Sequence, residues 1–234
     1  FHAKALEGSN FITLELTKVY RQTDEHFLEI LNAIRDGITE DIDFEALNKR
    51  YQPDFDPKDE AYVYLCSHNK MADDINQKKI KELGGKSHTY TADVVGEFKE
   101  TQYPNDEVLE LKVGAQIMFI RNDTSPDKKY YNGKLAQISY LDEDEISVIL
   151  DGSEEEITLK AETWEQKKYS LDADKNIQEE VLGSFKQFPI RLAWAVTIHK
   201  SQGLTFDRLI IDAGKSFASG QVYVALSRCR TLEG

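Results

Sequence analysis

The feature that most constrains the fold is a polar block between two apolar runs. AWAV precedes it and LII follows it, and the block consists of Thr197, His199, Lys200, Ser201, Gln202 and Gly203. In α/β proteins such a block stands where a strand ends and its loop presents side chains at the edge of the sheet. The stretch from residue 188 to residue 228 therefore predicts an α/β domain with a ligand site at that edge.

Earlier segments show the same alternation of strands and helices. Residues 13–21 predict a strand with Leu14, Leu16 and Val19 buried, followed by a helix that Thr23 caps and Gly37 ends. The apolar stripe of that helix consists of Phe27, Ile30, Leu31 and Ile34. Short helices are predicted over 44–51 and 71–83, the second after a buried strand over 61–67. In the last helix, Val222, Ala225, Leu226 and Cys229 form the apolar stripe. The seven-residue spacing of Gln221 and Arg228 places both on one neighbouring face.

The pattern changes between residues 108 and 185. Short strand-like runs, LELKVGAQIMFIRN, KLAQISYL, EISVIL and EEITLK, are separated by turn signals such as Asn132-Gly133 and Asp151-Gly152. This predicts a small antiparallel barrel over 108–185, inserted into an α/β lobe made of residues 1–107 and 186–234.

Several of these segments carry a family resemblance. TIHKSQGLTF resembles motif V, and QVYVALSR resembles motif VI, of the Pif/RecD-like superfamily 1 DNA helicases. LTKVYRQTDEHFLEILNAIRDG is similar to the motif IV region, and LKVGAQIMFIRN with YYNGKLAQI is similar to the entry to the inserted barrel. The resemblance implies an α/β fold, a RecA-like P-loop NTPase-type lobe without its own P-loop, carrying an inserted SH3-like β-barrel.

The resemblance also implies a function. A helicase of this kind moves 5′ to 3′ along single-stranded DNA, unwinds duplexes, and binds ATP and Mg²⁺ mainly through an upstream lobe that this chain lacks. Arg21 and Arg228 would act on the γ-phosphate, with Gln22, Gly203 and Gln221 also near ATP. The residues placed at single-stranded DNA are His68, Asn69, Thr197, His199, Lys200, Ser201 and Gln202. We expect a monomer in the bacterial cytoplasm or, in a eukaryote, the nucleus.

The residues themselves leave alternatives open. Arg21 could be a surface arginine at a strand end, Arg228 a surface ion pair, and Asn69 a helix cap. His199 alone would usually be structural, but its place beside Lys200 favours a phosphate or sugar contact. For Arg21 and Arg228, a permanently charged guanidinium whose fork matches phosphate oxygens suits the catalytic reading.

A phosphate-binding loop is not found. Gly84-Gly85-Lys86-Ser87 contains GKS, but the motif needs a glycine where Ile80 stands, and the two glycines end a helix. We therefore expect no ATP hydrolysis by this chain alone. The spacing of Cys66 and Cys229 suits no zinc site, and reduced thiols are expected.

Charge and composition limit the remaining classes. The net charge of −13 is unfavourable for DNA, but residues 187–230 hold six Lys or Arg against two acids, a local charge of +4. No apolar run is long enough to span a membrane. The chain begins with Phe1 instead of Met, and we expect a piece of a longer protein. The alternative function is a non-catalytic protein- or nucleic-acid-binding module derived from a helicase.

Overall fold

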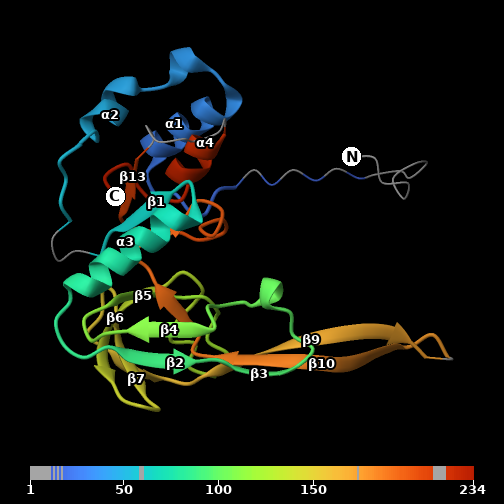
Figure 1. The fold of residues 1–234 in the computed structure, drawn as a ribbon. Coiled ribbons are helices and arrows are strands. Elements are labelled where there is room, and N and C mark those ends of the chain that lie inside the picture. Colours follow the sequence, from blue (N-terminus) through green and yellow to red (C-terminus); the bar gives the residue numbers. More distant parts are fainter. Residues whose placement is uncertain are drawn as a thin grey trace.

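The computed structural model describes residues 12, 14, 16, 18–57, 61–172, 174–212 and 220–234. These residues form two halves, an α/β half at the top of Figure 1 and an all-β half below it. A long hairpin extends sideways from the all-β half (Figure 1).

The α/β half is built on a three-stranded parallel sheet in the order β12-β1-β13. Its strands are β1 (Val63–Cys66), β12 (Ala195–Thr197) and β13 (Leu209–Ile211). The central strand β1 therefore pairs with two strands that follow the entire all-β segment in sequence. This confirms the buried strand expected at 61–67. The LII run after the polar block forms β13, and β12 begins in the AWAV run and ends at Thr197.

The helices of this half are α1 (Glu25–Asp36), α2 (Phe44–Lys49), α3 (Asn69–Glu82) and α4 (Gln221–Leu226). Short 3₁₀ turns lie at Thr39–Asp41 and, beside the all-β half, at Glu100–Gln102. The α3 helix contacts β12 and β1, and α1 contacts α4. As expected, Gly37 ends α1 in the left-handed conformation (φ 73°). The expected cap Thr23 is wrong by one residue, because the Asp24 carboxylate accepts the bond from the Phe27 N–H at 3.0 Å.

The strand predicted over residues 13–21 is not formed in the described part of that segment. Residues 13, 15 and 17 lie outside the described residues, but Leu14 and Leu16 are 84% and 95% exposed and Val19 is 42% exposed. A strand needs a neighbour to satisfy its backbone and cover its apolar side chains. In the described sheet, neither β12 nor β13 pairs with this segment, so the apolar alternation alone does not produce a strand.

The all-β half runs from β2 to β11, and its described residues form three sheets. The largest is antiparallel, in the order β11-β5-β6-β7-β8; the others are β3-β10-β9 and β2-β4. The strands are β2 (His88–Thr91), β3 (Asp93–Gly96), β4 (Val108–Leu111), β5 (Gln116–Phe119), β6 (Leu135–Leu141), β7 (Ile146–Leu150), β8 (Glu156–Leu159), β9 (Glu162–Leu171), β10 (Ile177–Gln187) and β11 (Ile190–Leu192).

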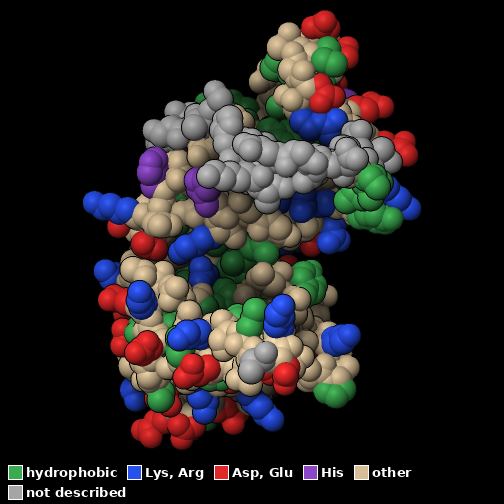
Figure 2. Space-filling view, turned by 90° about the vertical axis from the view of Figure 1, so that its right-hand side faces the viewer, with side chains coloured by type: hydrophobic (Ala, Val, Ile, Leu, Met, Phe, Trp, Pro, Cys, Tyr) green, Lys and Arg blue, Asp and Glu red, His purple; other side chains and the backbone are tan. Residues whose placement is uncertain are grey.

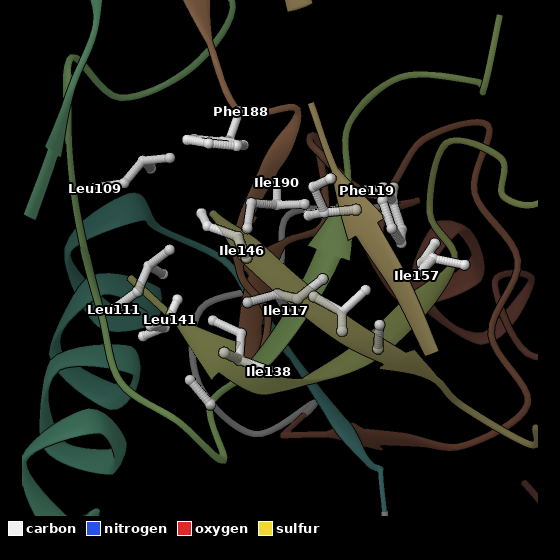
Figure 3. Close-up of a cluster of buried hydrophobic side chains, with 14 of the residues drawn as sticks. Leu109, Leu111, Ile117, Phe119, Ile138, Leu141, Ile146, Ile157, Phe188 and Ile190 are labelled. Atoms are coloured by element: carbon white, nitrogen blue, oxygen red, sulfur yellow. The ribbon is translucent and has the colours of Figure 1, made fainter. Parts of the chain in front are cut away.

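A closed SH3-like barrel is not formed. Among the described strands, β8 and β11 lie at opposite edges of the five-stranded sheet without pairing. The chain after β8 leaves this sheet, because β9 pairs with β10 instead. The open side is covered by side chains of β2 and β4, whose Tyr90, Leu109 and Leu111 belong to the same buried cluster as Ile117 and Ile146. Figure 3 shows the labelled side chains of this cluster converging on one another.

The β9–β10 hairpin was not among the predicted strands. Its turn is held by Asp172, whose carboxylate accepts from the N–H groups of Asp174 and Asn176. Near its base, Phe185 packs against Phe98, Tyr103 and Trp164. Farther out most side chains are exposed, and Lys167 bridges Glu165 and Glu179.

Candidate nucleotide and nucleic-acid sites

The first site brings together residues from both ends of the chain. Arg21 donates from Nε to Thr205 Oγ1 at 2.9 Å and from Nη1 to the Ser227 carbonyl at 3.4 Å. The adjacent Gln22 donates from Nε2 to the carbonyls of Ser227 and Cys229 at 3.1 and 2.9 Å. Arg21 and Gln22 are thus bound directly to the turn that follows α4.

Arg228 lies in that same turn. The seven-residue spacing to Gln221 predicted that Arg228 projects from the helix. The helix α4 ends at Leu226, however, so Arg228 projects from the turn two residues beyond that end. It donates from Nε to the Val224 carbonyl at 3.0 Å and from Nη2 to Ser227 Oγ at 2.8 Å. These bonds fix the guanidinium against α4. Gln221 is the first residue of α4.

The electrostatics of this cluster favour an anion. Burial lowers the pKa of the Arg228 guanidinium, and the nearby positive charge of Arg21 lowers it further. Two cations held close together repel each other, and a bound anion would relieve that repulsion. We call Arg21, Gln22, Thr205, Ser227 and Arg228 the arginine cluster.

The second site is the polar block, which forms a tight turn after β12. Thr197 is buried, and its Oγ1 accepts from the Lys200 N–H at 3.3 Å. Ser201 has no exposed surface, and its hydroxyl donates to the Ile198 carbonyl at 2.7 Å. The two hydroxyls therefore hold the turn, so in this conformation the Ser201 side chain cannot reach a ligand. His199, Lys200 and Gln202 are exposed.

Gly203 closes this turn with a φ of 84°, in the left-handed region that favours glycine. The chain then reaches Thr205, the partner of Arg21, within two residues. The polar turn and the arginine cluster are therefore joined by a very short connection.

The corner between β1 and α3 lies beside the polar turn, because the Ile198 N–H donates to the Cys66 carbonyl at 2.9 Å. The residues that follow Cys66 include His68 and Asn69, and both are exposed. His68 is the N-cap of α3, but no side-chain bond caps the helix there, and its Nδ1 lies 2.7 Å from Ser67 Oγ. Asn69 is the first helical residue, so it does not have the capping role that the sequence left open.

A cleft of about 400 Å³ lies between α3, β4, β11 and β12. Three of the expected DNA-binding residues, Asn69, Thr197 and Lys200, line it, together with Arg191 and Asn76. Figure 2 shows the surface hollowed between the two halves, with Lys and Arg side chains around the hollow. His68, His199 and Gln202 are not among the lining residues.

Sequence reasoning missed Asn76, which is 9% exposed. Its Nδ2 donates to the Ala195 carbonyl at 2.8 Å, and its Oδ1 accepts from the Ala195 N–H at 2.9 Å. The amide therefore substitutes for a neighbouring strand at the edge of β12. A polar residue at an inward position of an otherwise apolar helix face is the signal that could have found it.

Arg191 was counted only as one of the basic residues of the region. It lies on β11 and donates to the Pro104 carbonyl at 3.1 Å, in the part of the all-β half that faces the cleft. In the described part of the chain, no group of three or more His, Cys, Asp or Glu side chains could hold a metal ion. None of the helices described is long and apolar enough to cross a membrane.

Comparisons with known proteins agree with this geometry. No family model matches the chain. The ATP-dependent DNA helicase PIF1 of Homo sapiens is 34% identical over 247 residues, which cover 100% of this chain and 36% of that protein. The crystal structure of Bacteroides sp. Pif1 in complex with ADP-AlF4 superposes with a TM-score of 0.84 at 39% identity, covering 94% of this chain and 50% of that one. Bacteroides Pif1 bound to ssDNA gives 0.64 at 38% identity, with the same coverage.

The sequence and the fold thus match one segment of the superfamily 1 DNA helicases. Within that class, the matches fit a C-terminal portion of Pif1, so the chain is Pif1-like and the resemblance seen in motifs IV, V and VI is confirmed. The chain spans between about a third and a half of the length of the relatives that it matches.

Proposed function

We propose that this chain is the C-terminal motor lobe of an ATP-dependent helicase that translocates 5′ to 3′ on single-stranded DNA and unwinds duplexes. The observation that carries the proposal is the meeting of Arg21 and Arg228 at Ser227, although they are separated by most of the chain. The RecA-like character of the lobe and its monomeric state are part of the proposal. Relatives named as ATP-dependent DNA helicases, and a Pif1 crystallised with ADP-AlF4, support the nucleotide.

The arginine cluster would contact the γ-phosphate of ATP. Each guanidinium is already held by carbonyl or hydroxyl oxygens, so little side-chain freedom is lost when phosphate binds. Fixed cations stabilise the negative charge of a transferring phosphoryl group, which is the role of an arginine finger. Gln22 belongs to this cluster, Gly203 lies two residues before Thr205, and Gln221 is the first residue of α4, so we place all three near ATP. Mg²⁺ and the remaining phosphates would be held mainly by another lobe.

The polar turn and the start of α3 would contact the DNA strand. Lys200, His199, Gln202, His68 and Asn69 present exposed donors of the kind that bind phosphate and sugar without reading sequence. Thr197 and Ser201 would act by shaping the turn. A Pif1 crystallised with ssDNA supports this partner. The protein would then act wherever cellular DNA lies, in the bacterial nucleoid or the nucleus.

The short connection between the two sites suggests how they communicate. Thr205 binds Arg21, and Gly203 ends the polar turn. A movement of Arg21 toward a bound phosphate would therefore displace Thr205 and, two residues earlier, the turn that holds DNA. ATP binding and hydrolysis would alternately tighten and release the strand.

The test is Arg228→Ala in the full-length protein. We expect DNA-stimulated ATP turnover to fall about 10³- to 10⁵-fold, because the charge on the transferring phosphate loses a fixed partner. Affinity for single-stranded DNA should change little, since the polar turn is intact. Arg35→Ala is the matched control, because Arg35 is an exposed arginine at the end of α1 that pairs with Asp36, and turnover should be unchanged. Wild-type turnover in Arg228→Ala would refute the proposed role.

A non-catalytic binding module is the second candidate, and the β9–β10 hairpin favours it. Leu171 pairs with Ile177 in the ladder, and Tyr169 and Val181 lie on the same face; all four are more than half exposed. Lys167 and Glu179 share this face, and exposed apolar side chains beside an ion pair on a projecting hairpin suit a protein partner. If the full-length protein binds DNA but shows no ATP turnover, this second function replaces the first.

A further inference from the structure

Arg191 is a partly buried arginine whose guanidinium the protein satisfies only in part. Its Nη2 donates to the Pro104 carbonyl at 3.1 Å and lies 3.5 Å from Asn105 Oδ1. Its Nε is buried and has no hydrogen-bond partner. A buried charged donor without a partner is costly, and native proteins seldom keep one without a reason. The loop that holds it is itself fixed, because Asn105 Nδ2 donates to the carbonyls of Phe188 and Ile190.

The surroundings of Arg191 limit what could complete it. Burial lowers the pKa of the guanidinium, and the carboxylates of Asp106 and Asp73 act in the opposite direction. Both acids line the same cleft, as does Glu110. Among the described residues, no carboxylate lies within ion-pair distance of Arg191, so these acids are near it without neutralising it directly.

The charge of the cleft disfavours a phosphate in its interior. The cleft lining contains Asp73, Asp106 and Glu110 against Arg191 and Lys200, so a phosphate would meet more negative than positive charge there. A nucleobase edge is different, because it carries a carbonyl acceptor for a guanidinium and N–H donors for carboxylates. Cytosine, guanine and thymine have such an edge, whereas adenine has no carbonyl.

We propose that the cleft receives one carbonyl-bearing nucleobase of the bound single strand, and that Arg191 donates to its carbonyl oxygen. The inference rests on the proposed DNA-binding function and adds a base-contacting residue to it. Exposed Lys200 and Asn69 line the same cleft, so the phosphate of that nucleotide would remain with the polar turn while the base enters.

The size and walls of the cleft fit this ligand. Its volume of about 400 Å³ falls in the range of about 300–1,000 Å³ that small-molecule sites occupy. Val108, which is exposed, and Leu192, which is partly exposed, line the cleft and provide apolar surface for the face of a base. Asp73 on α3 and Asp106 before β4 come from different halves of the protein, so donors on the base edge would find acceptors on both sides.

The test uses the full-length protein and thymine oligonucleotides with one abasic site moved along the strand. We expect one position at which losing the base weakens binding about ten-fold or more, since a good base contact is worth about 1–3 kcal/mol. Adenine at that position should weaken binding as well. Arg191→Met should weaken binding of the intact strand by a similar factor and bind the abasic strand no worse than the wild type does, which is the signature of a direct contact.

The variant Arg191→Lys tests whether the ligand of Arg191 is a base or a phosphate. Lysine keeps the charge but not the fork of donors, so it should behave like Arg191→Met if the ligand is a base carbonyl. Replacing a single phosphate of the strand with a neutral methylphosphonate gives a second test of whether Arg191 contacts a base or a phosphate. If it removes the effect of Arg191→Met and no abasic site does, Arg191 binds phosphate and the proposal is wrong. Equal loss at every abasic position would also overturn it.

Folding is controlled by measuring the thermal unfolding of both Arg191 variants, and only folded variants enter the comparison. If Arg191→Met does not fold, Arg191→Lys and the abasic scan of the wild type decide the matter. Failure of the wild-type protein to bind single-stranded DNA at all would count against the proposed function, whereas binding without a base-dependent position would count against this inference alone.

Discussion

The two halves of the molecule use their polar side chains differently. In the all-β half, the buried amide of Gln187 donates to the carbonyls of Tyr90 and Glu107 and serves the fold alone. In the α/β half, polar side chains gather at two sites, and Arg21 and Arg228 crowd two positive charges together. The first arrangement stabilises a structure, and the second leaves binding capacity unused. The proposed function therefore places the chemistry in the α/β half, with Arg191 on β11 as a ligand contact from the all-β half.

The hydrophobic cores differ in the same sense. The buried cluster of the all-β half is built around a continuous antiparallel sheet (Figure 3). Its side chains come from three parts of the chain, namely Tyr90, residues 109–159, and Phe188 with Ile190. The parallel sheet of the α/β half has three short strands, and its edge strand β12 relies on the amide of Asn76. We therefore expect core substitutions in the all-β half to affect stability strongly and ligand binding little.

The largest effect is expected for Phe119→Ala. Phe119 is fully buried and stacks on Tyr130 with ring centroids 3.8 Å apart, so its loss should lower the free energy of unfolding by about 3–5 kcal/mol. Urea unfolding followed by circular dichroism measures this. Phe44→Ala, at a position 54% exposed, is the control and should have little effect. Similar losses in both variants would mean that the all-β core is not the stable part.

A smaller loss of stability is expected for the two buried amide side chains, Asn76 and Gln187, and their effects on DNA binding should differ. Asn76→Ala and Gln187→Ala each leave buried backbone groups without partners and should each lower stability by about 2–4 kcal/mol. Only Asn76 joins the helix that begins at Asn69 to the strand that ends at Thr197. We therefore expect weaker binding of single-stranded DNA in Asn76→Ala alone, measured by fluorescence anisotropy at a temperature where both variants are folded. Equal weakening in both would remove the distinction between the halves.

The sequence predicted what depends on local pattern and on motifs. The α1 stripe, the strand at residues 61–67 and the polar turn follow from spacing and residue type, and the convergence of Arg21 with Arg228 followed from resemblance. What it could not predict depends on partners distant in the chain. The alternation over Leu14 and Leu16 indicated a strand, but no described strand pairs with it. The turn signals indicated a closed barrel, yet β9 pairs with β10 and leaves the sheet open.

The site showed the same limit. Thr197 and Ser201 have the residue types of phosphate ligands, but both are buried by the turn that they stabilise. Burial depends on how the turn packs, which a motif does not state. Asn76 and Arg191 were missed as lining residues for the opposite reason, because nothing near them in sequence shows that α3 and β11 face one cleft.

The smallest effect concerns the contact between the first helix and the end of the chain. The Asp24 carboxylate caps α1 through the Phe27 N–H and also accepts from the Leu232 N–H at 3.3 Å. The bond from Phe27 is the main reason why the pKa of Asp24 lies below its ordinary value, so the ionised form is favoured in the folded state. This stabilisation is present above the unfolded-state pKa of about 3.9 and is lost as the pH falls through the lower folded-state value.

Asp24→Ala should therefore lower the free energy of unfolding by about 1 kcal/mol at pH 7, the usual cost of a lost N-cap. Asp24→Asn keeps a capping oxygen without the charge and should cost less. The advantage of the wild type over Asp24→Asn should persist at pH 5 and shrink toward pH 3, which urea unfolding at these pH values measures. If the advantage is the same at all three pH values, the cap does not act through its charge, and the α1 contact resembles the uncharged amide bonds of the all-β half.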